Sequence, residues 1–281
     1  MNDFAVFILT YGRAEKVYTF ETLKKQGYTG KVYFLCSTDD KQLGNYKKFY
    51  KDKVCVFNKE DYINKFDIGD NFDDRRVVVY ARNAVFDVAK KLNIKYFLVL
   101  DDDYTDFGYR FNNELKYVYK GIKNLDTVFK SILKFYKKTN VLSIALAQGG
   151  DYIGGKESGF AQKVQLKRKC MNTFFCSTDR RFNFIGRINE DVNTYVALAT
   201  TGGVFFTTSQ LSVQQLQTQS NSGGLTEFYL DGGTYVKSFY TILFSPSSVK
   251  INLMGNKHKR LHHKIKWNNT VPKILSEIHK K

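Results

Sequence analysis

Short apolar runs alternate with helical segments along the first part of the chain. Apolar runs at 3–10, 31–36 and 54–57 have the length and composition of buried strands. The segments between them, 14–26 and 42–50, are expected to form helices. A β-α-β-α-β order predicts a parallel sheet with right-handed crossovers.

The same pattern continues towards the middle of the chain after a polar interruption. Residues 58–74 are predicted to form a loop or a short helix, and 76–92 form a helix with a broad apolar face. The apolar run 96–100 is a further buried strand. A loop is expected at 104–110.

The second half is less regular, and it predicts a mixed sheet. Residues 124–138 have apolar positions at helical spacing, and 208–226 are rich in Gln, Ser, Thr and Gly, which favours an exposed loop. Short strands are expected at 117–120, 141–147, 171–177, 182–185, 204–207 and 249–253, and a helix or strand around 235–243. The fold class is therefore α/β, with a Rossmann-like, mostly parallel sheet flanked by helices and a mixed C-terminal half.

Composition narrows the class of protein. The chain has 281 residues with 43% hydrophobic residues, enough for one large domain. It has no run of about 18 apolar residues that would span a membrane, and its start has no secretory pattern. The four cysteines lack C-x-x-C spacing, so zinc and redox functions are disfavoured. Reduced thiols and a cytoplasmic location are expected, in a host cell if the protein is viral.

Charge is strongly positive and unevenly distributed. The formal net charge is +17, and residues 151–281 hold 18 of the 44 basic but only 8 of the 27 acidic side chains. Such a surplus attracts a polyanion, most obviously nucleic acid. The alternative is a general Lys enrichment from an AT-rich genome. Both explanations can hold together.

The most informative stretch is the strand 97–100, because it runs directly into Asp101, Asp102 and Asp103. Adjacent carboxylates at a strand end repel one another unless a cation lies there. Alternation along a strand would turn Asp101 and Asp103 to the same side, which suits Mn²⁺ or Mg²⁺ bridging a diphosphate. The alternative is a solvated acidic turn.

A nucleotide site also needs groups that contact the base, the ribose and the phosphates. Ligands of open α/β sheets bind beyond the carboxyl ends of the strands, and several polar residues are expected there. Arg75 and Arg82 are seven residues apart, so one helix would aim both at one target. Taken singly, each such residue also fits a plain surface position. The candidates for this nucleotide site are Thr10, Tyr11, Gly12, Arg13, Asp39, Arg75, Arg82, Asn83, Asp101 and Asp102.

The order of these motifs resembles the GT-A fold glycosyltransferases over residues 3–207. The resemblance rests on T-Y-G-R after the first strand, A-R-N in a helix, and a hydrophobic strand into D-D-D. It implies a metal and a nucleotide-sugar diphosphate at the acidic motif. The segment Asn189-Glu190-Asp191-Val192 resembles the later acidic motif of this family, which implies Asp191, or else Glu190, as the catalytic base of an inverting member. A retaining enzyme would need no such base, and Asp191 would then only orient other groups.

The tail also carries a family feature. His262 and His263 resemble the C-terminal histidine with which some members complete the metal shell. The implied metal ligands are then Asp101, Asp103 and His262. The alternative is a basic, solvated tail.

Within this fold the chain is most similar to phage glycosyltransferases associated with TET/JBP-type base hydroxylases. The similar pieces include A-Q-G-G-D-Y-I-G-G, I-N-E-D-V-N-T-Y, T-T-G-G and L-H-H-K-I-K-W. The similarity implies transfer of a sugar from UDP-glucose or UDP-GlcNAc, with Mn²⁺ or Mg²⁺, to the hydroxymethyl group of 5-hydroxymethylcytosine or 5-hydroxymethyluracil in DNA. Alternatives are a glycosyltransferase acting on a protein or surface glycan, and a non-catalytic nucleic-acid-binding protein.

The same resemblance divides the chain into a single GT-A-like domain, 1–281. Residues 1–103 form the nucleotide-sugar half, 104–250 the acceptor half, and 251–281 a basic tail. The acceptor-binding residues are then expected to be Gln148, Asp151, Tyr152, Lys167, Arg168 and Lys169. Phosphates of DNA are expected near a basic group that also includes Lys163, Arg180, Arg181 and Arg187.

Overall fold

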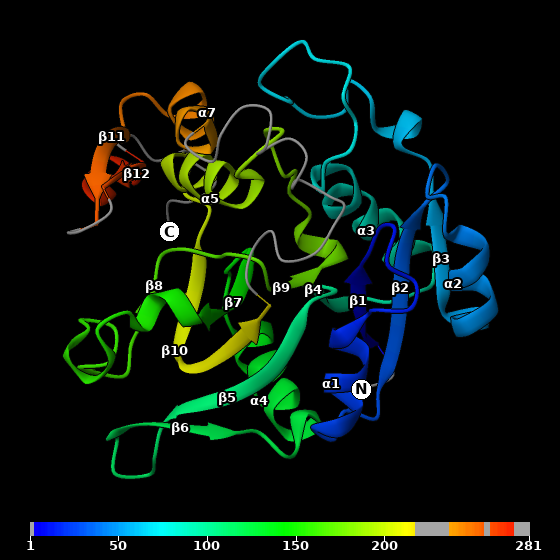
Figure 1. The fold of residues 1–281 in the computed structure, drawn as a ribbon. Helices are drawn as coiled ribbons and strands as arrows, with labels where there is room; N and C mark the ends of the chain where they lie inside the picture. Colours follow the sequence, from blue (N-terminus) through cyan, green and yellow to red (C-terminus); the bar gives the residue numbers. More distant parts are fainter. Residues whose placement is uncertain (1–2, 217–235, 256–258, 273–281) are drawn as a thin grey trace.

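A computed structural model describes residues 3–216, 236–255 and 259–272 (Figure 1). Among these residues, ten strands form one central sheet and two more form a separate hairpin near the C-terminus. The central sheet runs in the order β3 (Val54–Phe57), β2 (Lys31–Ser37), β1 (Phe4–Leu9), β4 (Tyr96–Asp101), β9 (Phe174–Ser177), β7 (Ser143–Gln148), β10 (Phe205–Gln215), β5 (Tyr104–Phe111) and β6 (Tyr117–Gly121), with β8 (Leu166–Lys167) paired to β10. The hairpin is β11 (Val249–Met254) and β12 (Arg260–Ile265).

The sheet is parallel in its first half and mixed in its second. Strands β3, β2, β1 and β4 are all parallel neighbours. Strand β9 is antiparallel to both β4 and β7, β7 is parallel to β10, and β5 and β6 are antiparallel additions at the edge. The α/β architecture predicted from the sequence is therefore confirmed, including its change of character in the second half.

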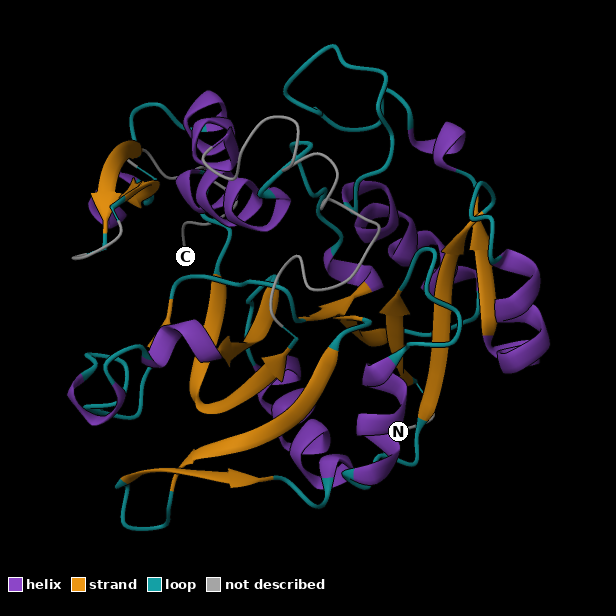
Figure 2. Cartoon of the chain, in the orientation of Figure 1, coloured by secondary structure: helices purple, strands orange, loops and turns teal. Residues whose placement is uncertain are grey.

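Helices cover both faces of this sheet (Figure 2). Along β1 the side chains alternate, so that Phe4, Val6 and Ile8 enter one core while Ala5, Phe7 and Leu9 enter the other. The first core contains residues of α1 (Tyr18–Lys25), α2 (Leu43–Tyr50) and α4 (Leu125–Lys138), and the second contains residues of α3 (Val79–Lys91) and α5 (Glu190–Thr200). Helix α7 (Val236–Phe244) packs beside the hairpin. Within the described ranges, no helix has the length and apolarity needed to cross a membrane.

Two loop predictions are wrong. Residues 104–110 belong to β5, and residues 208–215 belong to β10; these two strands pair with each other in antiparallel fashion. Ser212 is buried although its segment is polar, because it pairs with Gly108 of β5, about 100 residues away in the sequence. Ser209 is also buried, and it is bonded to Gln165. Residues 217–226 of the same predicted loop lie outside the described part of the chain.

The strand predicted at 182–185 does not form either. Phe182 and Phe184 are buried in the second core, but the backbone of Phe184 pairs with a side chain instead of a strand. The Asn83 amide donates to the carbonyl of Phe184 at 2.9 Å, and the amide N–H of Phe184 donates back to Asn83 at 2.9 Å. The predicted strand 171–177 is shortened to 174–177, and helix 76–92 begins only at Val79.

Gln26 ties the end of α1 to the edge strands that follow the acidic turn. Its side-chain amide donates to Asp106, to the carbonyl of Phe107 and to that of Ile122, at 2.8 to 2.9 Å. Its carbonyl oxygen accepts from the N–H of Phe107 at 2.8 Å. Gln26 is buried, so these bonds are made out of reach of water.

We therefore expect Gln26→Leu to lower the free energy of unfolding by about 3 kcal/mol, because it leaves buried backbone groups without partners. Urea unfolding followed by circular dichroism measures this loss. The exposed Gln162 provides a matched control, and Gln162→Leu should change stability by less than about 0.5 kcal/mol. Equal losses for the two variants would contradict the role given to Gln26.

Candidate active site

The three adjacent carboxylates lie where β4 ends and the chain turns into β5. Only Asp101 belongs to the strand. Asp102 is buried, and it accepts hydrogen bonds from the Thr10 hydroxyl at 2.7 Å and from the Arg13 guanidinium at 3.0 Å. Strand alternation therefore does not turn Asp101 and Asp103 to the same side, because β4 ends before Asp103.

Thr19, near the start of α1, holds the backbone of this turn. Its hydroxyl donates to the carbonyl of Asp101 at 2.6 Å and accepts from the N–H of Tyr104 at 2.9 Å. Its own N–H donates to the carbonyl of Asp102 at 3.2 Å. Thr19 is fully buried. No feature of the sequence distinguishes it from other small polar helix residues, so its role becomes visible only in the structure.

The loop after β1 and the loop after β2 lie together, as the strand-end argument predicts. Gly12, at a φ of 70° that glycine adopts without strain, donates its N–H to Asp40 at 2.8 Å. The Tyr11 hydroxyl donates to the carbonyl of Asp39 at 3.4 Å. Lys59 lies 4.7 Å from the centre of the Tyr11 ring and pairs with the Asp39 carboxylate at 2.9 Å. The carboxylate of Asp40 is buried and bonded within the loop, whereas the carboxylate of Asp39 is half exposed.

Arg82 joins the acidic turn to the second acidic motif. Its Nη2 donates to Asp101 at 2.9 Å, and its Nε donates to Glu190 at 3.0 Å. The side chain is 2% exposed, and its guanidinium lies 4.8 Å from the ring of Phe174. Among the described residues its Nη1 has no hydrogen-bond partner. One buried cation of α3 thus links the end of β4 to the start of α5, and its bond to Glu190 spans 108 positions of sequence.

Two neighbours of Arg82 do not take the positions predicted for them. Arg75 precedes α3 and pairs with Glu60, so it does not share a helix face with Arg82. Asn83 is buried, and its side chain bonds the backbone of Val79 and Phe184. These bonds use the amide protons and the carbonyl of Asn83, so the nucleotide contact predicted for it is corrected to a packing role.

Glu190 and Asp191 occupy the first turn of α5. Asn189 precedes them in the left-handed region, with a φ of 57°. Asp191 is buried and accepts from the N–H of Val192 at 2.7 Å. Burial, and then the charge of Glu190, raise the pKa of Asp191 well above its usual range, and the charge of Arg82 only partly opposes this. A carboxylate so placed is a competent proton acceptor near neutral pH.

Asp103 shows that the turn holds more negative charge than its cations balance. Burial, and then the charges of Asp101 and Asp102, raise the pKa of Asp103 to about 7, although Arg13 opposes them. Hard divalent cations prefer such carboxylate oxygens, so Asp101 and Asp103 fit Mn²⁺ or Mg²⁺ chemically. In the described part of the chain no three His, Cys, Asp or Glu side chains are grouped to hold a metal. A cation here therefore needs further oxygens, such as those of a diphosphate.

The histidine next to the acidic motif is His263 and not His262. Successive residues of β12 face opposite ways, and His263 Nδ1 lies 3.3 Å from the Asn189 amide. Burial, and then the charges of His262 and Lys237, lower the pKa of His263 to about 4. Within the part of the chain that the structure describes, His262 forms no group with Asp101 and Asp103, so its place in the metal shell stays a prediction. Residues 260–265 form strand β12 of the hairpin instead of an irregular tail.

The predicted acceptor residues gather around the turn after β7. Asp151 accepts from the N–H of Gln148 at 2.8 Å and pairs with Lys169. Tyr152 is 5% exposed and donates to the carbonyl of Ser209 at 2.5 Å, so it packs inside instead of facing an acceptor. Lys167 lies over the Phe160 ring, and Arg168 is exposed.

Three arginines of the predicted phosphate-binding group have structural partners instead. Arg187 is 1% exposed and pairs with Asp70 at 2.7 Å. Arg181 pairs with Asp87, and Arg180 donates to the carbonyls of Tyr136 and Val141. The basic surface of the second half is therefore formed by its lysines and Arg168.

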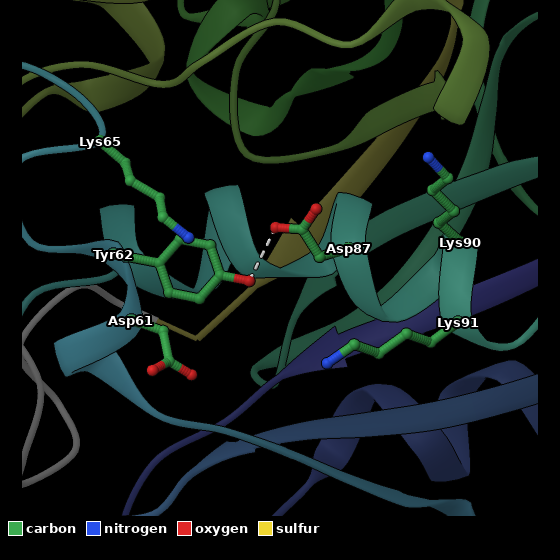
Figure 3. Close-up of a pocket in the computed structure, with 6 residues that line it drawn as sticks. All are labelled: Asp61, Tyr62, Lys65, Asp87, Lys90 and Lys91. Atoms are coloured by element: carbon green, nitrogen blue, oxygen red, sulfur yellow. Dashed lines mark hydrogen bonds between the residues drawn. The ribbon is translucent and has the colours of Figure 1, made fainter.

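A hollow of about 490 Å³ beside α3 contains none of the clustered carboxylates (Figure 3). Its Tyr62 hydroxyl donates to Asp87 at 2.8 Å, and Lys65 lies 4.9 Å from the Tyr62 ring. It has charges of both signs and is lined by Asp61, Tyr62, Lys65, Asp87, Lys90 and Lys91. We do not assign the active site to it.

Comparison with known proteins identifies the family of the chain. A model of the TET-associated glycosyltransferase family matches residues 4–224. The chain belongs to this family. Membership of the TET-associated glycosyltransferases makes it an enzyme that transfers a sugar, which confirms the predicted family and class of activity. No curated protein matches the chain.

Several solved structures are similar at low identity. Glucosyl-3-phosphoglycerate synthase from Mycobacterium tuberculosis, solved with Mg²⁺ and uridine diphosphate, has 8% identity and a TM-score of 0.44, covering 93% of this chain and 87% of its own. A mycobacterial protein has 9% identity and a TM-score of 0.48, covering 93% and 83%. S. aureus TarS has 14% identity and a TM-score of 0.43, covering 85% of this chain and 39% of its own.

The raised pKa of Asp103 has a consequence for stability. Because the folded protein holds this proton more tightly than the unfolded chain, stability falls as pH rises from about 4 to about 7, and the loss remains above pH 7. Without divalent cations, Asp103→Asn should therefore be more stable than the wild type at pH 8, by about 2 kcal/mol after solvent screening. Near pH 4 the two should be equal.

Urea unfolding at the two pH values measures this difference. Asp179→Asn is the control, because Asp179 is exposed and paired with Lys95, so its replacement should bring no gain at pH 8. If Asp103→Asn were less stable than the wild type at pH 8, the excess of negative charge at this turn would be refuted.

Proposed function

We propose that this enzyme transfers a sugar from a UDP-linked donor, UDP-glucose or UDP-GlcNAc, to the hydroxymethyl group of a modified pyrimidine in DNA, with Mn²⁺ or Mg²⁺ bound. The observation that carries this proposal is the excess of carboxylates at the end of β4, linked by Arg82 to the acidic pair of α5. The family's association with TET enzymes supports a hydroxylated base, 5-hydroxymethylcytosine or 5-hydroxymethyluracil, as the acceptor.

The donor is assigned to the carboxyl ends of β1, β2 and β4. Asp101 and Asp103 would hold the cation, which neutralises charge on the leaving diphosphate when bound. Tyr11 offers a ring to the base, and Asp39 offers a half-exposed carboxylate to the base or the ribose. Arg13 is 20% exposed and close enough to the acidic turn to contact a phosphate.

Asp191 is the proposed base. The hydroxymethyl oxygen of the acceptor forms a bond to C1 of the sugar while the bond from C1 to the β-phosphate oxygen breaks. UDP leaves, and the hydroxyl proton passes to Asp191. Its raised pKa supports this role, and Glu190 is less suitable because Arg82 already binds it. A single displacement of this kind inverts the configuration at C1.

The acceptor is assigned to the second half of the chain, where Lys167 and Arg168 supply positive charge for DNA phosphates. We assign the enzyme to the cytoplasm, that of the host cell if it is encoded by a bacteriophage. This setting suits its four cysteines, which are all unpaired thiols.

The direct test is a transfer assay followed by mass analysis of nucleosides. The enzyme is incubated with UDP-glucose or UDP-GlcNAc, Mn²⁺, and DNA containing hydroxymethylated or plain pyrimidines. We expect sugar on hydroxymethylated nucleosides alone and none after chelation of the metal. Transfer to a glycan or protein but never to DNA would favour the first alternative, and DNA binding without consumption of any donor would favour the second.

In the same assay Asp191→Asn should lower kcat at least about 100-fold, because the acceptor hydroxyl loses its base. The KM for the nucleotide sugar should stay within about twofold, since the proposal gives Asp191 the acceptor hydroxyl and no nucleotide group to bind. The exposed Asp179→Asn serves as control and should keep full activity. Undiminished kcat in Asp191→Asn would remove Asp191 from the reaction.

A further inference from the structure

The C-terminal hairpin β11–β12 carries positive charge that its own sequence does not balance. Residues 249–267 contain six Lys or Arg residues and no Asp or Glu. The hairpin lies beside α7 and close to α5 in Figure 1. It lies beyond residues 4–224, so the family match assigns it no role.

The pairing of the two strands places like charges together. Lys250 lies directly opposite Lys264, and Asn252 lies opposite His262. Opposed residues share a face of the ribbon, so these four side chains belong to one face. Both lysines are exposed. Like charges directly across a strand pair are destabilising, and a polyanion bound to this face would remove that cost.

The other face of the hairpin packs against the protein near the hairpin base. Val249 is buried in the second core, with Ile265 and Trp267 packed against it. His263 contacts Asn189, the residue before the acidic pair of α5. The Trp267 ring stacks on Tyr195 with centres 6.0 Å apart. These contacts fix the hairpin base, and the exposed residues of this face near the tip, Leu253 and Leu261, are uncharged. The face with Lys250 and Lys264 is therefore the one that presents positive charge to a partner.

The base of the hairpin adjoins the basic segment of the acceptor half. The Arg168 guanidinium lies 5.5 Å from the Trp267 ring and donates to the carbonyl of Trp267 at 3.3 Å. Arg168, which Lys167 and Lys169 flank in the sequence, therefore contacts the hairpin base. The hairpin thus extends a basic surface that begins next to the proposed acceptor site.

A two-stranded ribbon of this kind has the right size for a DNA duplex, because the major groove admits such a ribbon. The two lysines of this face lie opposite each other, Lys250 on β11 and Lys264 on β12, so they present two positive charges at the same level of the ribbon. Each of these charges can neutralise a phosphate of the duplex. We propose that the outer face of β11–β12 binds the duplex backbone flanking the acceptor nucleotide, an inference that rests on the proposed function.

The test compares two double variants of equal charge change. Lys250→Gln/Lys264→Gln removes the opposed pair, and Lys90→Gln/Lys91→Gln removes two lysines from the end of α3. Affinity for a short fluorescein-labelled DNA duplex is measured by anisotropy between about 50 and 200 mM salt. The hairpin variant should bind roughly tenfold more weakly, and its salt slope should fall by about 1.8, or about 0.9 per lost contact. The helix variant should bind as the wild type does.

Folding of the hairpin is checked separately with Lys264→Glu, which turns the repulsion from Lys250 into attraction. This variant should keep or raise the melting temperature while weakening duplex binding. Equal salt slopes for the wild type and the hairpin variant, with DNA transfer intact, would overturn the hairpin inference alone. A wild-type chain that neither binds duplex nor transfers sugar to DNA would overturn the proposed function as well. Binding of poly-glutamate but not duplex through these lysines would replace DNA by an acidic protein partner.

Discussion

The structure of the site depends on one buried arginine. Arg82 projects from α3 between a carboxylate at the end of β4 and another at the start of α5. A buried guanidinium is strongly disfavoured unless carboxylates pair with it, and an unpaired buried carboxylate is disfavoured in turn. Asp101 and Glu190 therefore require Arg82 as much as it requires them. This mutual dependence fixes the end of β4 and the start of α5 relative to each other.

The same region keeps more negative charge than its arginines neutralise. Arg13 and Arg82 face a group that comprises Asp101, Asp102, Asp103, Glu190 and Asp191. The excess raises the pKa of Asp103 and of Asp191, which costs stability in the free protein. Strongly shifted carboxyls gathered at strand ends are typical of functional sites. A cation bound with a diphosphate would offset the repulsion at Asp103, and a proton taken from the substrate would neutralise Asp191.

Local pattern was enough to predict the part of the site that follows from sheet topology. The apolar run before Asp101 identified a buried strand, and the rule that parallel strands end at one edge brought Thr10 to Arg13 and Asp39 to the same place. Periodicity does not reveal which distant segment completes a sheet. For that reason the polar strand β10, with buried Ser212, was expected to be a loop.

The sequence also did not reveal which partners the polar and charged side chains bind. From the distribution of charge along the sequence, Arg187 was predicted to bind phosphate. In the structure it is buried and paired with Asp70. Two adjacent histidines look alike in a sequence, whereas strand alternation turns only His263 towards Asn189. Asn83 was expected to contact the nucleotide. Its side chain instead forms hydrogen bonds with the backbone of Phe184, in a segment that belongs to no strand. Each of these outcomes depends on contacts between residues far apart in the chain.

The central claim is that the carboxylates ending β4 form a cation-dependent diphosphate site. Isothermal titration calorimetry with UDP, in Mn²⁺ or after chelation, tests this claim most directly. The account predicts that Mn²⁺ strengthens UDP binding at least about tenfold, and that Asp103→Ala loses this enhancement while Asp179→Asn retains it. Equal UDP affinity with and without Mn²⁺ in the wild type would contradict it.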